Sequence, residues 1–278
     1  MTPHAYVIGY PVKHSRSPQI HRYWLKHYDL AGSYDLAELT PDQLAPFIEK
    51  LRDDENAGTN VTLPYKQDVQ PYLDEIDDDA KNVGAVNTIY KSHGKLLGTN
   101  TDVYGFLTHL SDGAPNWLEI TNTVLIIGAG GAARAILSAM KKSSINNVYI
   151  ANRTKPRAQI LCDEIYPEAS PIEMSEITSI LATTDLIINT TSLGMIGQPP
   201  LELDLSALPE HSIVVDIVYS PLKTELLHQA EKRGLVTVDG LGMLLHQAVR
   251  GFELWFGTRP EVTDELRQIV EKSLETGS

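Results

Sequence analysis

Lys66 and Asp102 are the two side chains of this sequence best suited to moving a proton. Lys66 lies just past the end of a short strand pattern, and Asp102 follows the polar run Thr99–Thr101 where a helix can begin. Each has an ordinary alternative, because a single lysine is usually a solvated surface charge and an acid is favourable at a helix start. Together, however, an ammonium and a carboxylate can accept and return the proton of an alcohol.

Four segments in the first third of the chain place polar side chains beside small residues. They are Gly9–His21, Gly58–Lys66, Gly84–Thr88 and Gly98–Gly105. Ser15 and Ser17 precede a helix whose N–H groups can bind a small carboxylate, although helix capping alone would explain one serine. Asn87 interrupts an apolar strand. Because ligands of open α/β sheets bind beyond the strand carboxyl ends, we expect one polar rim suited to a small polyhydroxylated acid.

A glycine-rich turn follows the apolar run Thr123–Ile127. Gly128 allows a tight turn, Gly130 lets backbone approach a pyrophosphate, and the small Ala133 lets the next helix pack on the strand. The N-terminus of that helix offers N–H groups to an anion. A strand, a glycine turn and a helix in this order predict a dinucleotide site. Its expected turn residues are Gly128, Ala129, Gly130, Gly131 and Ala132.

The end of the following strand favours NADP over NAD. An NAD enzyme usually carries an acidic residue there to hold the ribose hydroxyls, whereas this chain has none. Arg153 can bind the adenosine 2′-phosphate in a bidentate fork, although a solvated basic turn would look the same. The missing acid and the arginine together indicate NADP. The residues expected at this turn are Asn152, Arg153, Thr154, Lys155 and Arg157.

Strand-like and helix-like stretches alternate along the chain and predict an α/β fold. The early strands are expected at 5–9, 33–39, 59–62, 85–90 and 95–99, the last two forming a hairpin closed at His93-Gly94. Helices are expected at 17–26, from Thr40-Pro41-Asp42-Gln43, whose residue types suit a capped start, and from Asp102.

The second half has a more regular pattern. Short apolar runs at 123–127, 148–151, 186–189, 213–217 and 236–238 are typical of a parallel sheet covered on both faces. The chain turns helical after Gly240, and Pro260-Glu261 is expected to start the last helix. The length of 278 residues favours two domains, and the turn-rich stretch Ser111–Asn116 is the candidate link.

Composition excludes several classes of function. A formal net charge of −13 repels phosphate backbones and argues against nucleic-acid binding. No apolar run is long enough to span a membrane, and Met1–Tyr10 does not look like a secretion signal. The single cysteine, Cys162, cannot form an intrachain disulfide and is expected to be buried in a helix, which fits a cytoplasmic protein. The histidine spacing suggests no metal site.

Taken in order, these motifs resemble the shikimate dehydrogenase family. The resemblance covers nearly the whole chain and continues through three later segments, Thr191–Met195, Asp216–Thr224 and Gly240–Ala248. One departure is visible, because family members commonly have Asn after the histidine at His21 and this chain has Arg22. We expect that change to affect local packing and not chemistry.

The resemblance implies a two-domain α/β protein with its active site in the cleft between the domains. An N-terminal substrate domain with a mixed sheet is expected at 1–104, a Rossmann-like, doubly wound NADP domain at 105–239, and helices returning to the substrate domain at 240–278. The implied reaction is the reversible NADPH-dependent reduction of 3-dehydroshikimate to shikimate, a step of aromatic amino-acid biosynthesis.

The resemblance also implies roles for individual residues. Lys66 is the expected catalytic residue, with Asp102 beside it. The expected substrate-binding residues are Ser15 and Ser17 for the carboxylate, Thr62, Asn87, Asp102 and Gln247 for the ring hydroxyls, and Tyr219 near the substrate. The further cofactor contacts are Ile217 and Gly240 at the nicotinamide, and Asp78, an acidic position that contacts the cofactor in some members.

Three alternatives remain open at this point. A quinate/shikimate dehydrogenase would accept more substrates and cofactors, but often carries an acidic residue near the position of Arg153. A non-catalytic sensor on the same fold would have lost Lys66 or Asp102, and both are present. The serine pair argues against an unrelated two-domain NADP enzyme such as a folate dehydrogenase. Either a monomer or a homodimer fits the sequence.

Overall fold

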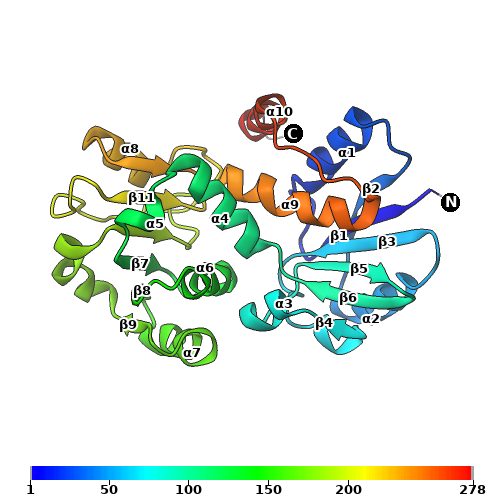
Figure 1. Cartoon of the computed structure of the whole chain (residues 1–278), viewed down its shortest axis with the longest axis horizontal. Helices are drawn as coiled ribbons and strands as arrows, with labels where there is room; N and C mark the ends of the chain where they lie inside the picture. Colours follow the sequence, from blue (N-terminus) through cyan, green and yellow to red (C-terminus); the bar gives the residue numbers. More distant parts are fainter. Residues whose placement is uncertain (1, 277–278) are drawn as a thin grey trace. The chain divides into compact units, whose positions relative to one another are not determined.

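The computed structural model describes residues 2–276, which form two compact units (Figure 1). The first unit contains the chain up to Asp102 together with Leu245–Lys272. The second contains Val103–Leu244 and, of the described residues after Lys272, Ser273–Thr276. Each unit is built around its own sheet, so each is described by itself.

The first unit contains a six-stranded mixed sheet in the order β2-β1-β3-β5-β6-β4. Its strands are β1 (His4–Gly9), β2 (Ser33–Glu38), β3 (Asn56–Val61), β4 (Glu75–Ile76), β5 (Thr88–Ser92) and β6 (Lys95–Thr99). The predicted β5–β6 hairpin is confirmed. Its turn residues His93 and Gly94 have φ angles of 50° and 76°, the left-handed conformation that closes tight hairpins.

Strand direction in this sheet decides where its polar residues lie. β1 and β3 are parallel, whereas β5 is antiparallel to both β3 and β6. The register pairs Asn60 with Thr88 and Thr88 with Thr99. The carboxyl ends of β3 and β6 therefore meet the amino end of β5 at one edge of the sheet.

The helices of the first unit are α1 (Ser17–His27), α2 (Pro41–Lys50), the 3₁₀ helix η1 (Gln70–Tyr72) and α3 (Asp78–Val83). Two of them, α1 and α2, begin as the sequence predicts, whereas η1 and α3 were not predicted. The capped start of α2 is confirmed, because the Thr40 N–H donates to Gln43 Oε1 at 2.9 Å. Arg22 of α1 binds β2, donating to Tyr34 O at 2.8 Å.

Two helices near the C-terminus complete the set. They are α9 (Leu241–Phe256), which begins in the second unit, and α10 (Asp264–Thr276). The expected start of the last helix at Pro260-Glu261 is wrong, since α10 begins only at Asp264. The reason is the cap: Thr263 Oγ1 accepts the Leu266 N–H at 3.2 Å, whereas a proline supplies no capping acceptor.

The second unit is a doubly wound parallel sheet in the order β12-β11-β10-β7-β8-β9. Its strands are β7 (Thr123–Ile127), β8 (Asn147–Ala151), β9 (Ser170–Ile172), β10 (Leu186–Asn189), β11 (Ile213–Asp216) and β12 (Val236–Val238). Every residue of β7, β10 and β11 is buried, as expected for strands covered on both faces. The expected two-domain α/β fold class is confirmed.

The helices of this unit surround the sheet (Figure 1). They are α4 (Asp102–Gly113), α5 (Trp117–Ile120), α6 (Gly131–Lys142), α7 (Lys155–Ile165), η2 (Met174–Ser179), η3 (Leu181–Thr183) and α8 (Glu225–Lys232). Because α4 runs to Gly113, the stretch Ser111–Asn116 lies inside this unit and is not a link. Cys162 is buried in α7 as expected, and burial raises its thiol pKa to about 11.

Residues 2–276 contain neither a membrane-spanning helix nor a metal-binding cluster of side chains. None of the helices described there is long and apolar enough to cross a lipid bilayer. Within the same residues, no group of three or more His, Cys, Asp or Glu side chains is arranged to hold a metal ion.

An aromatic cluster in the first unit surrounds the buried side chain of His21. The His21 ring is fully buried and stacks on Tyr34 with ring centroids 4.1 Å apart. Burial lowers the pKa of His21 to about 3, although the Asn60 side chain opposes this shift. The folded protein therefore keeps His21 neutral at pH values where the unfolded chain is protonated.

We predict that His21→Phe removes part of the acid sensitivity of folding. In the parent protein the unfolded state gains a proton as pH falls below about 6.5, so His21 should lower the free energy of unfolding by up to about 1.4 kcal/mol per pH unit. Urea unfolding at pH 7, 5.5 and 4.5 measures this slope. The exposed-site control His228→Gln should keep the parent slope. Equal slopes in His21→Phe and the parent would contradict the prediction.

Candidate active site

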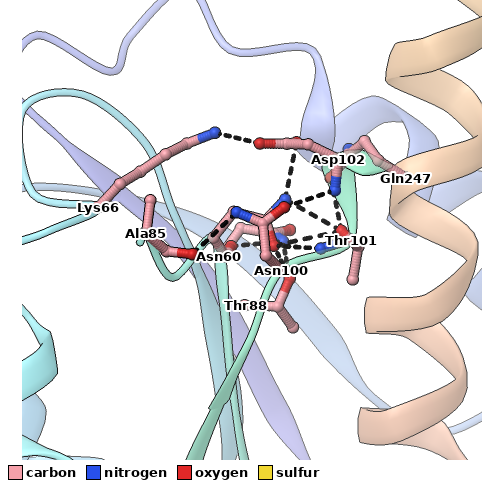
Figure 2. A network of polar contacts seen from close by, with 9 residues as sticks. Asn60, Lys66, Ala85, Thr88, Asn100, Thr101, Asp102 and Gln247 are labelled. Atoms are coloured by element: carbon pink, nitrogen blue, oxygen red, sulfur yellow. Dashed lines mark hydrogen bonds and ion pairs between the residues drawn. The ribbon is translucent and has the colours of Figure 1, made fainter. Parts of the chain in front are cut away.

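The centre of the candidate site is an ion pair between Lys66 and Asp102. Lys66 Nζ lies 2.6 Å from Asp102 Oδ2, and the two side chains are 23% and 13% exposed. Figure 2 shows them pointing toward one another above the sheet edge. Lys66 lies in the turn after β3, where its carbonyl accepts the Val86 N–H at 2.7 Å. Partial shielding from water strengthens the ion pair. The part of each side chain that stays exposed leaves both groups within reach of a ligand.

Asn87 orients the carboxylate of this pair. Its Nδ2 donates to Asp102 Oδ1 at 2.8 Å and to Thr101 Oγ1 at 3.0 Å. Its Oδ1 accepts the Thr101 N–H at 2.9 Å. One oxygen of Asp102 therefore contacts Lys66 and the other contacts Asn87, which restricts rotation of the carboxylate.

Two further asparagines, absent from the predicted site, support this arrangement (Figure 2). Asn100 Oδ1 accepts the Asp102 N–H at 3.0 Å, while its Nδ2 donates to Ala85 O at 2.9 Å. Asn60 Nδ2 donates to Asn87 O at 3.2 Å and to Thr88 Oγ1 at 3.1 Å. Their signal in the sequence is an amide at a strand end beside small residues.

Asn60 is itself hydrogen-bonded to Tyr34, a member of the aromatic cluster around His21. The Tyr34 hydroxyl donates to Asn60 Oδ1 at 2.5 Å. Burial raises the pKa of the Tyr34 phenol well above its usual range, while hydrogen bonding with the Ser17 side chain opposes that rise. Tyr34 therefore stays a neutral donor at ordinary pH.

Of the other expected substrate residues of the first unit, Gln247 is bonded directly to this network. Gln247 comes from α9, is buried, and its Oε1 accepts the Thr101 hydroxyl at 3.4 Å. Ser15 is half-buried and Ser17 buried, and Ser15 Oγ accepts the Ser17 N–H at 3.3 Å. Arg16 is the N-cap residue of α1, so Ser17 is not its cap. Thr62 is half-buried directly after β3.

The glycine turn of the second unit fits a pyrophosphate. Gly128 has a φ of 106°, and a Cβ there would lie 2.7 Å from Thr190 Oγ1, so this position requires glycine. Gly130 is exposed at the start of α6, and a Cβ built there meets no atom within 4 Å. Open space above backbone N–H groups at a helix N-terminus is what an anionic ligand needs. Ala129, Gly131 and Ala132 complete this turn.

The turn after β8 presents the predicted basic residues. Arg153 and Arg157 are exposed, and Asn152 Nδ2 donates to Thr154 O at 2.8 Å. Lys155 Nζ lies 3.2 Å from Glu176 Oε2. The Glu173 N–H and then Lys155 hold the pKa of Glu176 below its usual value, so Glu176 stays ionised and pairs with Lys155. Two exposed guanidinium groups suit the adenosine 2′-phosphate of NADP.

The remaining predicted residues lie on both units. Ile217 and Tyr219 follow β11 in the second unit and are half-buried. Gly240 packs against the backbone of Ile217, because a Cβ on Gly240 would lie 2.1 Å from Ile217 O. Asp78 is exposed at the start of α3 in the first unit, 3.6 Å from Lys81 Nζ. The expected contacts of all the predicted site residues with substrate or cofactor stay predictions.

A doubly wound domain with a glycine turn, together with a polar site carrying a Lys–Asp pair, defines a dinucleotide-dependent dehydrogenase. Three family sequence models match the chain: the shikimate dehydrogenase substrate binding domain at 7–89, shikimate / quinate 5-dehydrogenase at 117–241, and the shikimate 5′-dehydrogenase C-terminal domain at 240–271. The chain belongs to the shikimate dehydrogenase family.

Individual relatives agree with this assignment. A shikimate dehydrogenase (NADP(+)) of Nitrobacter winogradskyi is 48% identical over 97% of this chain and 96% of that protein. A Thermus thermophilus shikimate 5-dehydrogenase solved with NADP(H) and shikimate has a TM-score of 0.83 at 33% identity over 100% of both chains. A quinate dehydrogenase of Corynebacterium glutamicum solved with NAD has a TM-score of 0.90 at 31% identity, over 97% of this chain and 99% of that chain.

We predict that Asn100→Ala destabilises the site through two backbone groups, one partly buried and one buried. The Asp102 N–H and Ala85 O would both lose their partner, at a cost of about 1–3 kcal/mol each. A thermal melt should show a midpoint several degrees lower. The exposed Asn146→Ala is the matched control and should melt like the parent. An unchanged midpoint in Asn100→Ala would show that the two groups need no partner.

Proposed function

We propose that this chain catalyses the reversible NADP-linked conversion of shikimate and 3-dehydroshikimate, as an oxidoreductase acting on a ring alcohol. The observation that carries the proposal is the 2.6 Å contact between Lys66 and Asp102 at a polar sheet edge. Support comes from the family models and from curated relatives at 45–48% identity that are named shikimate dehydrogenase (NADP(+)).

The substrate-binding side chains match a hydroxylated cyclic acid. We assign the carboxylate to Ser15 and Ser17, whose hydroxyls adjoin the start of α1. We assign the ring hydroxyls to residues that combine donors and acceptors, and so can bind an alcohol in either direction. These are Thr62, Asn87, Asp102 and Gln247.

Lys66 and Asp102 handle the proton of the reacting hydroxyl. In the oxidation of shikimate, the pair accepts the hydroxyl proton while hydride leaves the same carbon. In the reverse direction, Lys66 Nζ donates a proton to the developing alkoxide, and Asp102 keeps the ammonium aimed at that oxygen. Asn87 holds the carboxylate in place throughout, because it bonds the oxygen that Lys66 does not use.

The second unit holds the cofactor in this proposal. When bound, NADP accepts the hydride in one direction and NADPH supplies it in the other. The glycine turn binds the pyrophosphate, and Arg153 with Arg157 binds the 2′-phosphate, assisted by Asn152 and Thr154. Ile217 and Gly240 are assigned to the nicotinamide, Tyr219 to the substrate, and Asp78 to a further cofactor contact.

Quinate is a second candidate substrate, favoured by the structural likeness to a quinate dehydrogenase solved with NAD. The basic turn after β8 argues for NADP over NAD, because it has no carboxylate for the ribose hydroxyls. Comparing kcat/KM for shikimate and quinate with each cofactor decides between the two. A higher value for quinate with NAD would favour the second candidate.

We further propose a cytoplasmic location and a monomer or homodimer. The buried, unpaired Cys162 thiol supports a reducing compartment. Fractionation of cells with a specific antibody tests the location, and light scattering on the purified protein distinguishes a monomer from a homodimer.

We predict that Lys66→Ala lowers kcat by about 10²–10⁴-fold, because it removes the proton-transfer group. KM for shikimate should change far less, since the interaction strengthens in the transition state. Absorbance of NADPH formed from shikimate and NADP measures both constants. The exposed Lys50→Ala is the control and should behave like the parent. A near-normal kcat in Lys66→Ala would remove Lys66 from the mechanism.

We predict that Arg153→Ala raises KM for NADP by about 10–100-fold, the value of one charge-assisted contact with a phosphate. KM for NAD should stay nearly unchanged, because NAD has no 2′-phosphate. Steady-state rates with each cofactor measure the two effects. Arg259→Ala, an exposed arginine of the first unit, is the control. Equal losses for NAD and NADP would mean that Arg153 does not read the phosphate.

A further inference from the structure

A buried carboxylate in the second unit has no part in the mechanism above. Asp216 ends β11, and its side chain is fully buried. Burial raises its pKa to about 6, while hydrogen bonds from Thr224, Val218 and Asn189 oppose the rise. A buried acid is costly unless it is fully hydrogen-bonded, so its presence at this strand end requires a structural or functional gain.

Three donors converge on the Asp216 carboxylate from three different segments. Asn189 Nδ2, at the end of β10, donates to Oδ1 at 2.9 Å, and the Val218 N–H donates to the same oxygen at 3.0 Å. The Thr224 hydroxyl, at the start of α8, donates to Oδ2 at 2.7 Å. The carboxylate therefore ties the turn after its own strand to a neighbouring strand and to a helix start.

Each donor is itself tied to a turn at this edge of the sheet. Asn189 Oδ1 accepts the Thr191 N–H at 3.0 Å, and its Nδ2 also reaches Leu193 O at 3.1 Å. The Thr224 hydroxyl oxygen accepts the Leu227 N–H at 3.4 Å and so caps α8. Loss of Asp216 would leave these turns without their common acceptor.

The segment that Asp216 holds also supports the turn after β12. A Cβ on Gly240 would lie 2.1 Å from Ile217 O and 2.8 Å from Val218 O, so the Gly240 backbone packs directly on this segment. Ile217, Tyr219 and Gly240 are the residues assigned to the nicotinamide and the substrate in the proposed function. The Asp216 carboxylate therefore helps to fix their backbone positions, together with the bond from the Ile217 N–H to Asn189 O at 3.1 Å.

We propose that Asp216 is a positioning residue for hydride transfer, acting through the backbone of residues 217–219. Its carboxylate accepts the Val218 N–H, and so fixes the backbone of Ile217 and Tyr219, the residues assigned to the nicotinamide and the substrate. The inference rests on the proposed function for its effect on turnover. The effect of Asp216 on the backbone of residues 217–219 does not depend on that function.

The first experiment compares Asp216→Ala with Asp216→Asn in the full-length protein. Alanine leaves Val218 N–H and Asn189 Nδ2 without an acceptor, whereas the asparagine Oδ1 can accept both and the Thr224 hydroxyl can turn to accept from its Nδ2. We expect Asp216→Ala to lower kcat by at least about tenfold through misplacement, and Asp216→Asn to recover most of that loss. Affinity for NADP, measured by titration, should change much less, because the 2′-phosphate turn is untouched.

Control variants at two further positions accompany the Asp216 variants. Asp204→Ala, an exposed acid of the same unit, should leave kcat unchanged. Thr224→Val removes one donor to Asp216, together with the α8 cap, while keeping the side-chain shape. It should lower kcat less than Asp216→Ala does, and Thr224→Ser, which keeps both bonds, should retain the parent value. If Asp216→Ala does not fold, this valine–serine pair decides: equal kcat in both would overturn the proposal.

Hydrogen exchange separates this inference from the proposed function. The amides of residues 217–219 should exchange faster in Asp216→Ala than in the parent, while those of β7 stay protected. If the parent does not oxidise shikimate but this difference appears, the proposed function fails, and what stands is that Asp216 fixes the backbone of residues 217–219. Unchanged exchange, or an unchanged kcat in a folded Asp216→Ala, would overturn the positioning role.

Discussion

The contact between Lys66 and Asp102 places the strongest constraint on the first unit. Both groups are largely withdrawn from water, and desolvating an ammonium and a carboxylate is costly unless further hydrogen bonds complete the pair. Asn87 supplies the bond to the second carboxylate oxygen, and Asn100 fixes the backbone of Asp102. Removing either would leave a charge or a buried N–H without its partner, so the polar network around the pair has little freedom to vary.

The direction of the strands makes that network possible. The end of β3 and the end of β6 reach the same edge as the beginning of β5, because β5 runs antiparallel to both. A segment entering a strand and two segments leaving strands therefore contribute to one polar edge. Asn87 lies just before β5, which is why it can bond to Thr101 and Asp102 just after β6.

In the second unit, the turns that follow the strands are suited to binding a phosphate-bearing cofactor. A cofactor with several phosphates needs exposed N–H groups and cations, and the turns after β7 and β8 supply them where strands and helices meet. The turns after β10, β11 and β12 present few charges and depend on internal hydrogen bonds for their shape. A buried carboxylate suits that task, because its two oxygens can accept from several segments at once.

The local sequence was sufficient to predict those structural features whose interactions join residues close together in the chain. The capped start of α2, the His93-Gly94 hairpin and the strand–glycine–helix order at Gly128 could all be predicted, because each depends on neighbours a few residues away. The residue types at the turn after β8 indicated a phosphate site for the same reason. The family resemblance then named the functional residues, among them Lys66 and Asp102.

Other features depended on contacts between residues far apart in the chain. β9 was not predicted, because it is a three-residue strand interrupted by Pro171 and exists only through pairing with β8. The supporting roles of Asn60 and Asn100 required the register of β3, β5 and β6. By itself the sequence determined which side chains were available and which short elements carry them. Only the tertiary structure decided which of them share a hydrogen bond, because that depends on strand order and direction, and no local pattern encodes these.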